Sequence, residues 1–302
     1  MADVLFDQPL LLLAVLLPGF WAAAWVGIKL RQAHPTREEK VDDDFSFVLG
    51  GALTLLGLLV GFSFSMAVGR YDLRKTLEEA EANAIGTEEV RADLLPAGDA
   101  ARVRELLRSY VDQRILFYTA RDAARLRQID ADTARLQAEL WSVVARHASV
   151  DSSPIAALVV AGMNDVLNSQ GYTQAAWWNR IPQAAWALLL AIAVFCNGLI
   201  GYHAHGRGAS LLLILPIALS ITLFLIADID SPRGGVIRVH PQNLESLAAS
   251  LRASCGSRRA GGERQRESPA RTAATKASGA SGVTTYRVRS VSTRTYASRR
   301  QA

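Results

Sequence analysis

The sequence predicts an all-α fold: four transmembrane helices with a helical extramembrane bundle inserted between helices two and three. Four runs contain no charged residue, at 10–28, 47–68, 184–202 and 209–227. A hydrocarbon core about 30 Å thick needs roughly 20 apolar helical residues, and a buried helix of a soluble protein is rarely apolar all round for that length. The polar residues between the second and third runs place apolar side chains at helical spacing, and no stretch alternates like a strand.

These observations divide the chain into parts that lie in the membrane and parts that lie in water. We expect transmembrane helices one and two in 1–69, a helical extramembrane domain in 70–182, transmembrane helices three and four in 183–228, a short C-terminal extension in 229–252, and a disordered basic tail in 253–302. The tail is too poor in apolar residues to form a core.

The first apolar run is predicted to be an uncleaved membrane helix. Asp3 and Asp7 occupy the place of the basic region of a signal peptide,. Pro18 removes a backbone donor near the middle of the run and is expected to kink the helix. The polar stretch from Lys29 to Asp44 is predicted to be a loop.

The stretch from Gly61 to Pro96 connects the predicted membrane part of the chain to the predicted extramembrane domain. It begins inside an apolar run, becomes charged and Ala-rich at Arg70, and contains no proline before Pro96. We therefore expect one helix, or two nearly coaxial ones, leaving the bilayer at Arg70 and continuing into water.

Helix signals continue through the extramembrane domain. Asp99 follows a turn at Pro96 and is predicted to cap a helix, and Ser153-Pro154 has the pattern of an N-cap followed by a first-turn proline. That last helix is expected to run to about Asn168. Trp177 and Trp178 are expected to mark the return to the membrane interface.

Composition excludes several classes of function. Residues 252–302 hold 12 of the 33 Lys and Arg against two Glu, which leaves a net charge of −5 for the first 251 residues although the whole chain carries +5. No basic folded face is predicted, so no nucleic-acid partner is expected. The two cysteines form neither a disulfide framework nor a metal site, and no catalytic motif occurs. We expect no enzyme activity, metal or cofactor.

The second apolar run carries small residues on one face. Gly50, Thr54, Gly57, Gly61 and Ser65 follow one another at steps of four, three, four and four. Such spacing favours close packing of helices in lipid, which is the preferred interpretation. The alternative is a water-filled path lined by Thr54, Gly57, Gly61 and Ser65, which Phe62 and Phe64 would constrict.

Two polar groups flank the membrane. Arg70, Glu81, Asn83, Thr87 and Arg91 form either an ion-selecting vestibule or a set of buried hydrogen bonds between helices,. Asp228 and Asp230 could bind a hard cation, or could pair with Arg70 or Arg74, because a carboxylate at membrane depth is costly unless it is paired.

Several motifs, taken together, resemble the bestrophin-like domain family of bacterial membrane proteins, whose function is not established. They are GFSFSMAVGRYDLR (61–74), EANAIGT (81–87) with Arg91 and LLP (94–96), YVDQR (110–114), the helix of Trp141, MND (163–165), RIP (180–182) and DIDSPRGGVIRV (228–239). Glu88-Glu89 falls where the family is more apolar, and Ser231 where it has a basic residue. The family is remotely similar to true bestrophins, and that resemblance implies a pentameric ion channel with the second membrane helix lining an apolar neck.

Two functions therefore remain open. One is a homo-oligomeric ion channel, with the lipid bilayer and inorganic ions as partners. The other is a non-conducting membrane scaffold or sensor whose helical domain binds a partner. Either would be a multi-pass protein of a cell membrane, expected to be a bacterial inner membrane. A slight excess of Lys and Arg on the side of the helical domain favours cytoplasmic termini,.

Overall fold

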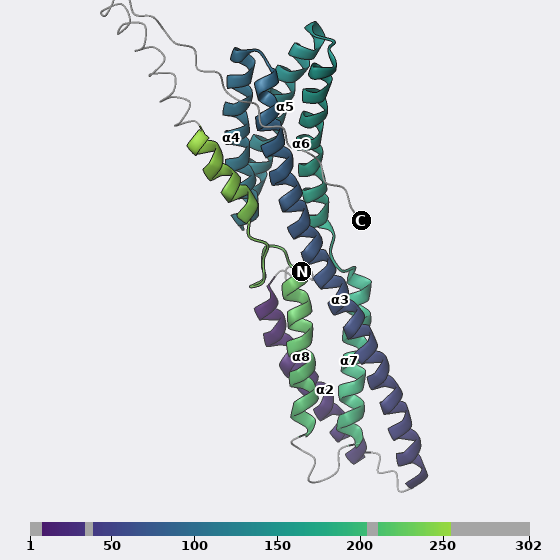
Figure 1. Ribbon diagram of the computed structural model, residues 1–302. Helices are drawn as coiled ribbons and strands as arrows, with labels where there is room; N and C mark the ends of the chain where they lie inside the picture. The colour runs from purple at the N-terminus through teal and green to yellow at the C-terminus, as the bar shows by residue number, and fades with distance from the viewer. Residues whose placement is uncertain (1–7, 34–38, 204–210, 255–302) are drawn as a thin grey trace, which may run out of the picture. The chain divides into compact units, whose positions relative to one another are not determined.

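The described part of the chain consists of helices and their connections. The structure is a computed structural model that describes residues 8–33, 39–203 and 211–254. Its helices are α2 (Pro9–Ala33), α3 (Glu39–Arg91), η1 (Ala92–Leu94), α4 (Ala97–Thr119), α5 (Ala123–Val150), α6 (Pro154–Trp178), α7 (Gln183–His203) and α8 (Leu211–Asp230), followed by a helix over 242–254 (Figure 1).

Helix α3 joins two regions of different character. It runs for 53 residues without interruption, a length of about 80 Å at 1.5 Å per residue. The prediction that the apolar segment ending at Val68 continues as helix into the polar domain is confirmed. The absence of proline between its ends is the physical reason, because nothing in the sequence removes a backbone donor or forces a break.

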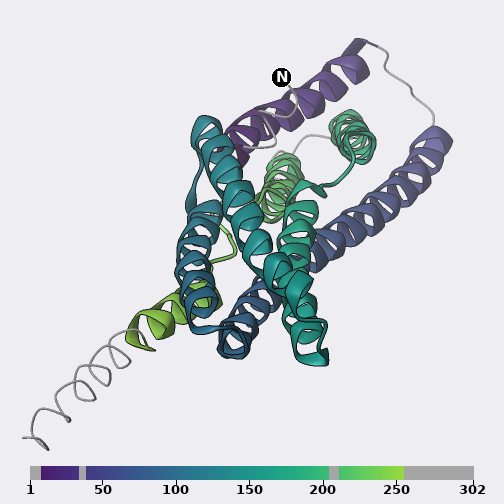
Figure 2. The ribbon, with the colours of Figure 1, turned by 90° about the horizontal axis from the view of Figure 1, so that it is seen from above.

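The apolar half gathers α2, α7, α8 and the first half of α3. Helices α7 and α8 lie between α2 and the start of α3 (Figure 2). Stretches long and apolar enough to cross a membrane occur in Pro9–Ala33, Ser46–Leu94 and Pro154–His203. The predicted fourth run, 209–227, coincides largely with α8.

The contact between α2 and α7 depends on glycine. A Cβ at Gly201 would lie 2.6 Å from the carbonyl carbon and 2.8 Å from the Cα of Ala24, and one at Gly27 would lie 2.7 Å from the backbone N of Tyr202. These two helices therefore meet backbone to backbone. Small residues permit this approach, and it strengthens dispersion contacts between helices in an apolar solvent.

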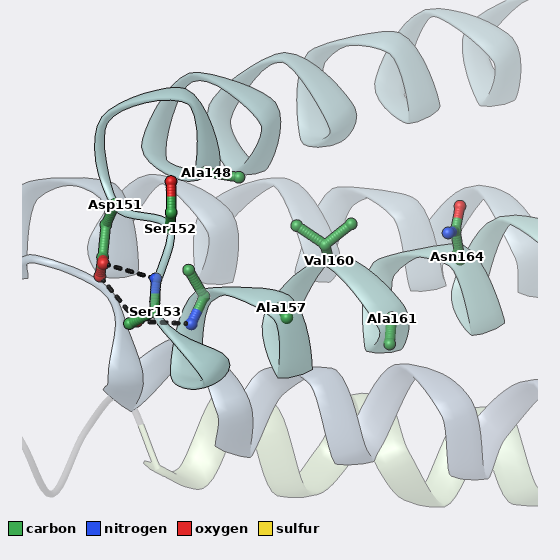
Figure 3. A pocket seen from close by; sticks show the side chains of 9 residues that line it. Ala148, Asp151, Ser152, Ser153, Ala157, Val160, Ala161 and Asn164 are labelled. Carbon is green, nitrogen blue, oxygen red and sulfur yellow. Dashed lines mark hydrogen bonds between the residues drawn. The ribbon is translucent and has the colours of Figure 1, made fainter.

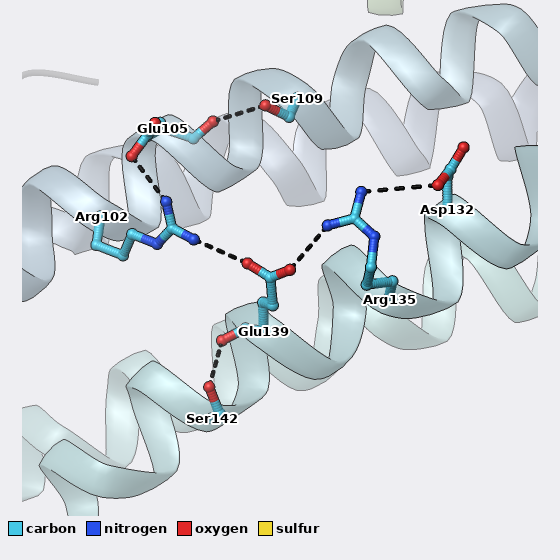
Figure 4. A network of polar contacts seen from close by, with 7 residues as sticks. All are labelled: Arg102, Glu105, Ser109, Asp132, Arg135, Glu139 and Ser142. Atoms are coloured by element: carbon cyan, nitrogen blue, oxygen red, sulfur yellow. Dashed lines mark hydrogen bonds and ion pairs between the residues drawn. The ribbon is translucent and has the colours of Figure 1, made fainter.

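The polar half, which we call the helical body, comprises the second half of α3 with η1, α4, α5 and α6. Its core is built from side chains at helical spacing, among them Ile85, Val103, Leu107, Leu140 and Met163. On its surface Arg102 of α4 pairs with Glu139 of α5 at 2.8 Å, and Glu139 also pairs with Arg135 of its own helix at 2.8 Å (Figure 4). Such exposed pairs contribute little to stability, so the apolar core holds these helices together.

The segment after α8 belongs to the same core. Leu244, Ala248 and Leu251 are buried with the residues of the body. Glu78 of α3 caps their helix, since its carboxylate accepts hydrogen bonds from the Leu244 backbone N at 2.9 Å and from the Asn243 side chain at 2.7 Å. The predicted extension is therefore packed against α3.

Several predicted boundaries are wrong. The stretch 29–44 is not all loop, because α2 continues to Ala33 and α3 begins at Glu39. Helix α4 starts at Ala97 with Pro96 in the capping position, two residues before Asp99. Helix α6 continues ten residues past Asn168.

The Ser153 cap is confirmed. Its side chain accepts a hydrogen bond from the Ala156 backbone N at 3.1 Å, and Pro154 occupies the first turn. The predicted disordered tail lies outside the described residues except for 253 and 254, which continue the last helix.

Candidate functional site: the outward face of helix α3 and its anchor

The small residues of α3 face away from the rest of the described chain. Thr54, Gly57, Gly61 and Ser65, which we call the outward stripe, are all exposed. A Cβ added at Gly57 or Gly61 would meet no atom within 4 Å. No other helix among the described residues packs on this stripe, so the preferred interpretation, close packing of helices in lipid, stays a prediction. The close glycine contact lies between α2 and α7 instead.

Phe62 and Phe64 flank the outward stripe. Both are exposed, at 62% and 40% of their surface. Residues two apart on an α-helix point about 160° away from each other, so the two rings lie on opposite sides of the stripe. They cannot both project along one direction from a single helix.

The predicted vestibule residues differ in exposure and fall into three groups. Asn83 and Thr87 are exposed, Arg70 and Arg91 are half-buried, and Glu81 is fully buried. Asn83 and Thr87 line a groove of about 430 Å³ together with Asn243, Ser246 and Ser250 of the last helix. Its polar lining consists of neutral amides and hydroxyls.

Glu81 joins three helices of the body. Its carboxylate forms an ion pair with Arg114 of α4 and accepts hydrogen bonds from Tyr118 at 3.4 Å and from Thr173 of α6 at 3.2 Å. Both charged side chains are completely buried. For Glu81, the interpretation as a buried hydrogen-bond network is confirmed. Arg114 was visible in the sequence only as part of the YVDQR motif.

An anchor of charged side chains holds α3 at the level where it leaves the apolar half. Arg70 pairs with Asp230 at 3.1 Å. Arg74, also buried, donates to the backbone O atoms of Ile229 and Asp230 at 3.1 Å and to that of Ala176 at 3.4 Å. One α3 side chain thereby satisfies carbonyls in the last turns of both α6 and α8, which have no partner inside their own helices.

Asp228 and Asp230 are occupied by donors of the protein. Asp228 accepts hydrogen bonds from the backbone N atoms of Val236 and Ile237 at 2.7 and 2.8 Å. Asp230 accepts one from Ile181 at 2.9 Å besides its pair with Arg70. Pairing with Arg70 was the alternative to a cation site. Among the described residues, no group of three or more His, Cys, Asp or Glu is placed to hold a metal ion.

Arg233, which follows α8, connects the end of α4 to the end of α6 beside this anchor. Its guanidinium donates to the backbone O atoms of Phe117 at 2.7 Å and Ala120 at 3.0 Å, and it lies 4.4 Å from the ring centroid of Trp177. Cations over aromatic faces are stabilised by the ring quadrupole. The Trp177 ring is buried in the body and its neighbour Trp178 is exposed, so only Trp178 presents its ring outward. That these two residues mark the membrane interface stays a prediction.

Glu88 is a buried carboxylate without a hydrogen bond among the described residues. It lies where α3 crosses α6, with Arg91 at 4.0 Å and Asp165 near by. Gly162 of α6 makes room for it, since a Cβ there would collide with Glu88 and lie 3.0 Å from Cδ of Arg91. Burial raises the pKa of Glu88 to about 8, Arg91 lowers it and Asp165 raises it further.

A second hollow lies at the corner between α5 and α6 (Figure 3). It has a volume of about 390 Å³ and is lined mainly by alanines and serines. Asp151 is its only carboxylate, and Asp151 accepts hydrogen bonds from the backbone and hydroxyl of Ser153 at 2.9 and 3.0 Å. This lining offers little for catalysis.

Comparisons with known proteins agree with this architecture. A family model described as bestrophin-like domain matches residues 14–244. No curated protein matches the chain. Crystal structures of a bacterial bestrophin homolog from Klebsiella pneumoniae match with TM-scores of 0.57 and 0.58 at 15% and 14% identity, covering 78% and 82% of this chain and 96% and 98% of theirs.

A further match is a crystal structure titled only as a membrane protein, at 16% identity and a TM-score of 0.57, covering 79% of this chain and 96% of that one. At such identities the likeness establishes the fold. The family model covers more than three quarters of the sequence, including the motifs that suggested the resemblance. The chain therefore belongs to the bestrophin-like domain family.

Proposed function

We propose that the chain is a homo-oligomeric ion channel with the outward stripe of α3 along the conduction axis. The observation that carries the proposal is the exposure of this stripe on a helix that continues from the apolar half into the body. Copies of α3 arranged around an axis would approach closely at Gly57 and Gly61 and would present the hydroxyls of Thr54 and Ser65 to an ion.

The membrane placement follows from the same helices. Four spans would cross the bilayer, α8 being the fourth, and would leave both termini and the body on one side. The Lys and Arg near the membrane favour the cytoplasm of a bacterium for that side. The remote resemblance to true bestrophins supports a ring of five.

The anchor gives α3 a fixed position in such an assembly. Arg70 and Arg74 tie it to α8 and α6 where it leaves the apolar half. A helix held at this level keeps its stripe in register with neighbouring copies. The polar continuation of α3, including Asn83 and Thr87, would then form the entrance to the path. Asp228 and Asp230 stay candidates for cation contact only if an ion displaces their present donors.

Conductance of the purified protein in planar bilayers tests the proposal. Gly61→Val should lower single-channel conductance about threefold or more, because it places a branched side chain on the axis. Met66→Val is the control, since Met66 is also exposed but points about 140° away from Gly61,. A silent monomer, or equal effects of both substitutions, would contradict the proposal.

One observation favours the alternative, a scaffold or sensor. Beside the hollow of Figure 3, the corner between α5 and α6 exposes Val150, Ile155 and Leu158, by 87% for Val150. Exposed apolar groups often mark surfaces that bind proteins. A scaffold predicts silent bilayers together with a defined partner that Val150→Asp releases, whereas a channel predicts current that this substitution leaves unchanged.

A further inference from the structure

Two turns lie side by side at the end of the body that adjoins the apolar half. One connects α4 to α5 and includes Ala120 and Arg121; the other, 231–237, follows α8. Arg233 joins them through its hydrogen bond of 3.0 Å to Ala120 O. It also lies on Trp177, one residue before the end of α6. We call the two together the double turn.

The first turn presents unpaired positive charge. Arg121 and Arg125 are exposed, and neither guanidinium has a hydrogen-bond or ion-pair partner among the residues that the structure describes. The neighbouring carboxylate, Asp122, accepts a hydrogen bond from the Arg125 backbone N at 2.7 Å and caps α5. Guanidinium groups bind phosphate oxygens in a bidentate geometry, so these two are suited to a phosphate.

The second turn, which Arg233 connects to the first, presents exposed apolar side chains. Val236 is 70% exposed and Ile237 is 39% exposed. Their backbone N atoms are held by Asp228, which fixes the turn. Apolar groups beside arginines are the combination that lies in the boundary between headgroups and acyl chains.

We propose that the double turn binds the headgroups of anionic phospholipids. Arg121 and Arg125 contact the phosphate while Val236 and Ile237 enter the acyl boundary. The arginines of the first turn carry positive charge, and the double turn lies beside the ends of α6 and α8, where the apolar half begins. Both features favour an anionic lipid surface as the binding partner. The inference rests on the membrane placement in the proposed function but requires no conduction.

Lipid titration of the detergent-solubilised full chain tests the inference. Phosphatidylglycerol should raise the temperature of unfolding more than phosphatidylcholine does. The double variant Arg121→Gln/Arg125→Gln should raise the half-saturating concentration of phosphatidylglycerol about 30-fold, taking about 1 kcal/mol for each arginine and a factor of ten for each 1.4 kcal/mol. The double substitution to Lys keeps the charge but not the bidentate geometry, so it should weaken binding less than the double substitution to Gln does.

Arg146→Gln is the matched control. Arg146 is exposed on the same helix but about 31 Å from Arg125 along its axis,, so its loss should leave the titration unchanged. The inference is overturned if both lipids stabilise equally, if Arg146→Gln has the effect of the double variant, or if inorganic phosphate at the same concentration replaces the lipid. Specific lipid binding without current would refute the channel and leave this inference intact. Failure to float with vesicles would refute the membrane placement itself.

Discussion

Replacement of Gly201 by alanine tests whether α2 and α7 meet as closely as the structure has them. The added methyl group would point at the backbone of Ala24, with its Cβ 2.6 Å from the carbonyl carbon. An ordinary contact is at least 3.4 Å, and the carbonyl oxygen of Ala24 would lie closer to the Cβ than its carbonyl carbon does, so the helices must separate locally by more than about 0.8 Å. The obstacle is backbone, and no side-chain rotation can relieve it.

Gly198 provides a control three residues away on the same helix. A Cβ there would lie 3.7 Å from the backbone O of Ala23, which is an ordinary contact. Both substitutions gain about 0.5–1 kcal/mol from the better helix propensity of alanine. The difference in unfolding free energy between the two variants therefore measures the steric collision alone. Overpacking costs about 1–3 kcal/mol. The upper end applies here because the obstacle is backbone, so Gly201→Ala should be less stable than Gly198→Ala by about 3 kcal/mol.

Thermal unfolding in detergent, followed by circular dichroism, measures this difference. At about 2–4 °C for each kcal/mol in a chain of this size, the Gly201 variant should unfold about 6–12 °C below the Gly198 variant. Gly27→Ala should behave like Gly201→Ala, because its Cβ meets the opposite backbone. Equal unfolding temperatures for the Gly198 and Gly201 variants would refute the close crossing of α2 and α7.

Two further predictions concern charges inside the body. Arg114→Met should destabilise the protein by about 3–5 kcal/mol because it leaves the Glu81 carboxylate buried without its cation. The double variant with Glu81→Leu should recover most of this loss. Additive losses in the double-mutant cycle would contradict the pairing. The pKa of Glu88, raised from 4.5 to about 8, means that the folded state binds a proton that the unfolded state releases between these values. The contribution of Glu88 to stability should therefore be full at and below about pH 4.5, fall as the pH rises and become level above pH 8,. Unfolding midpoints measured at pH 5, 7 and 9 should lose this slope in Glu88→Gln, and an unchanged slope would assign it to other groups.

The sequence alone predicted the local features of this chain. The continuity of α3 followed from a proline-free stretch, and the start of α6 from Ser153 and Pro154. Both depend on interactions within one or two turns of helix. Helix ends were less accurate: α6 runs to Trp178 because its last turn packs against α4 and Arg233, contacts that no local pattern reveals.

Tertiary structure decided which glycines carry helix contacts and which charges are buried. The stripe with Gly57 and Gly61 and the pair Gly27 and Gly201 both offer a small-residue surface, but only the second lies where another helix passes. In the same way, Glu81 and Asn83 are two residues apart, yet one faces Arg114 and the other faces outward. Periodicity fixes which residues share a face of a helix, whereas the arrangement of the other helices determines what that face meets.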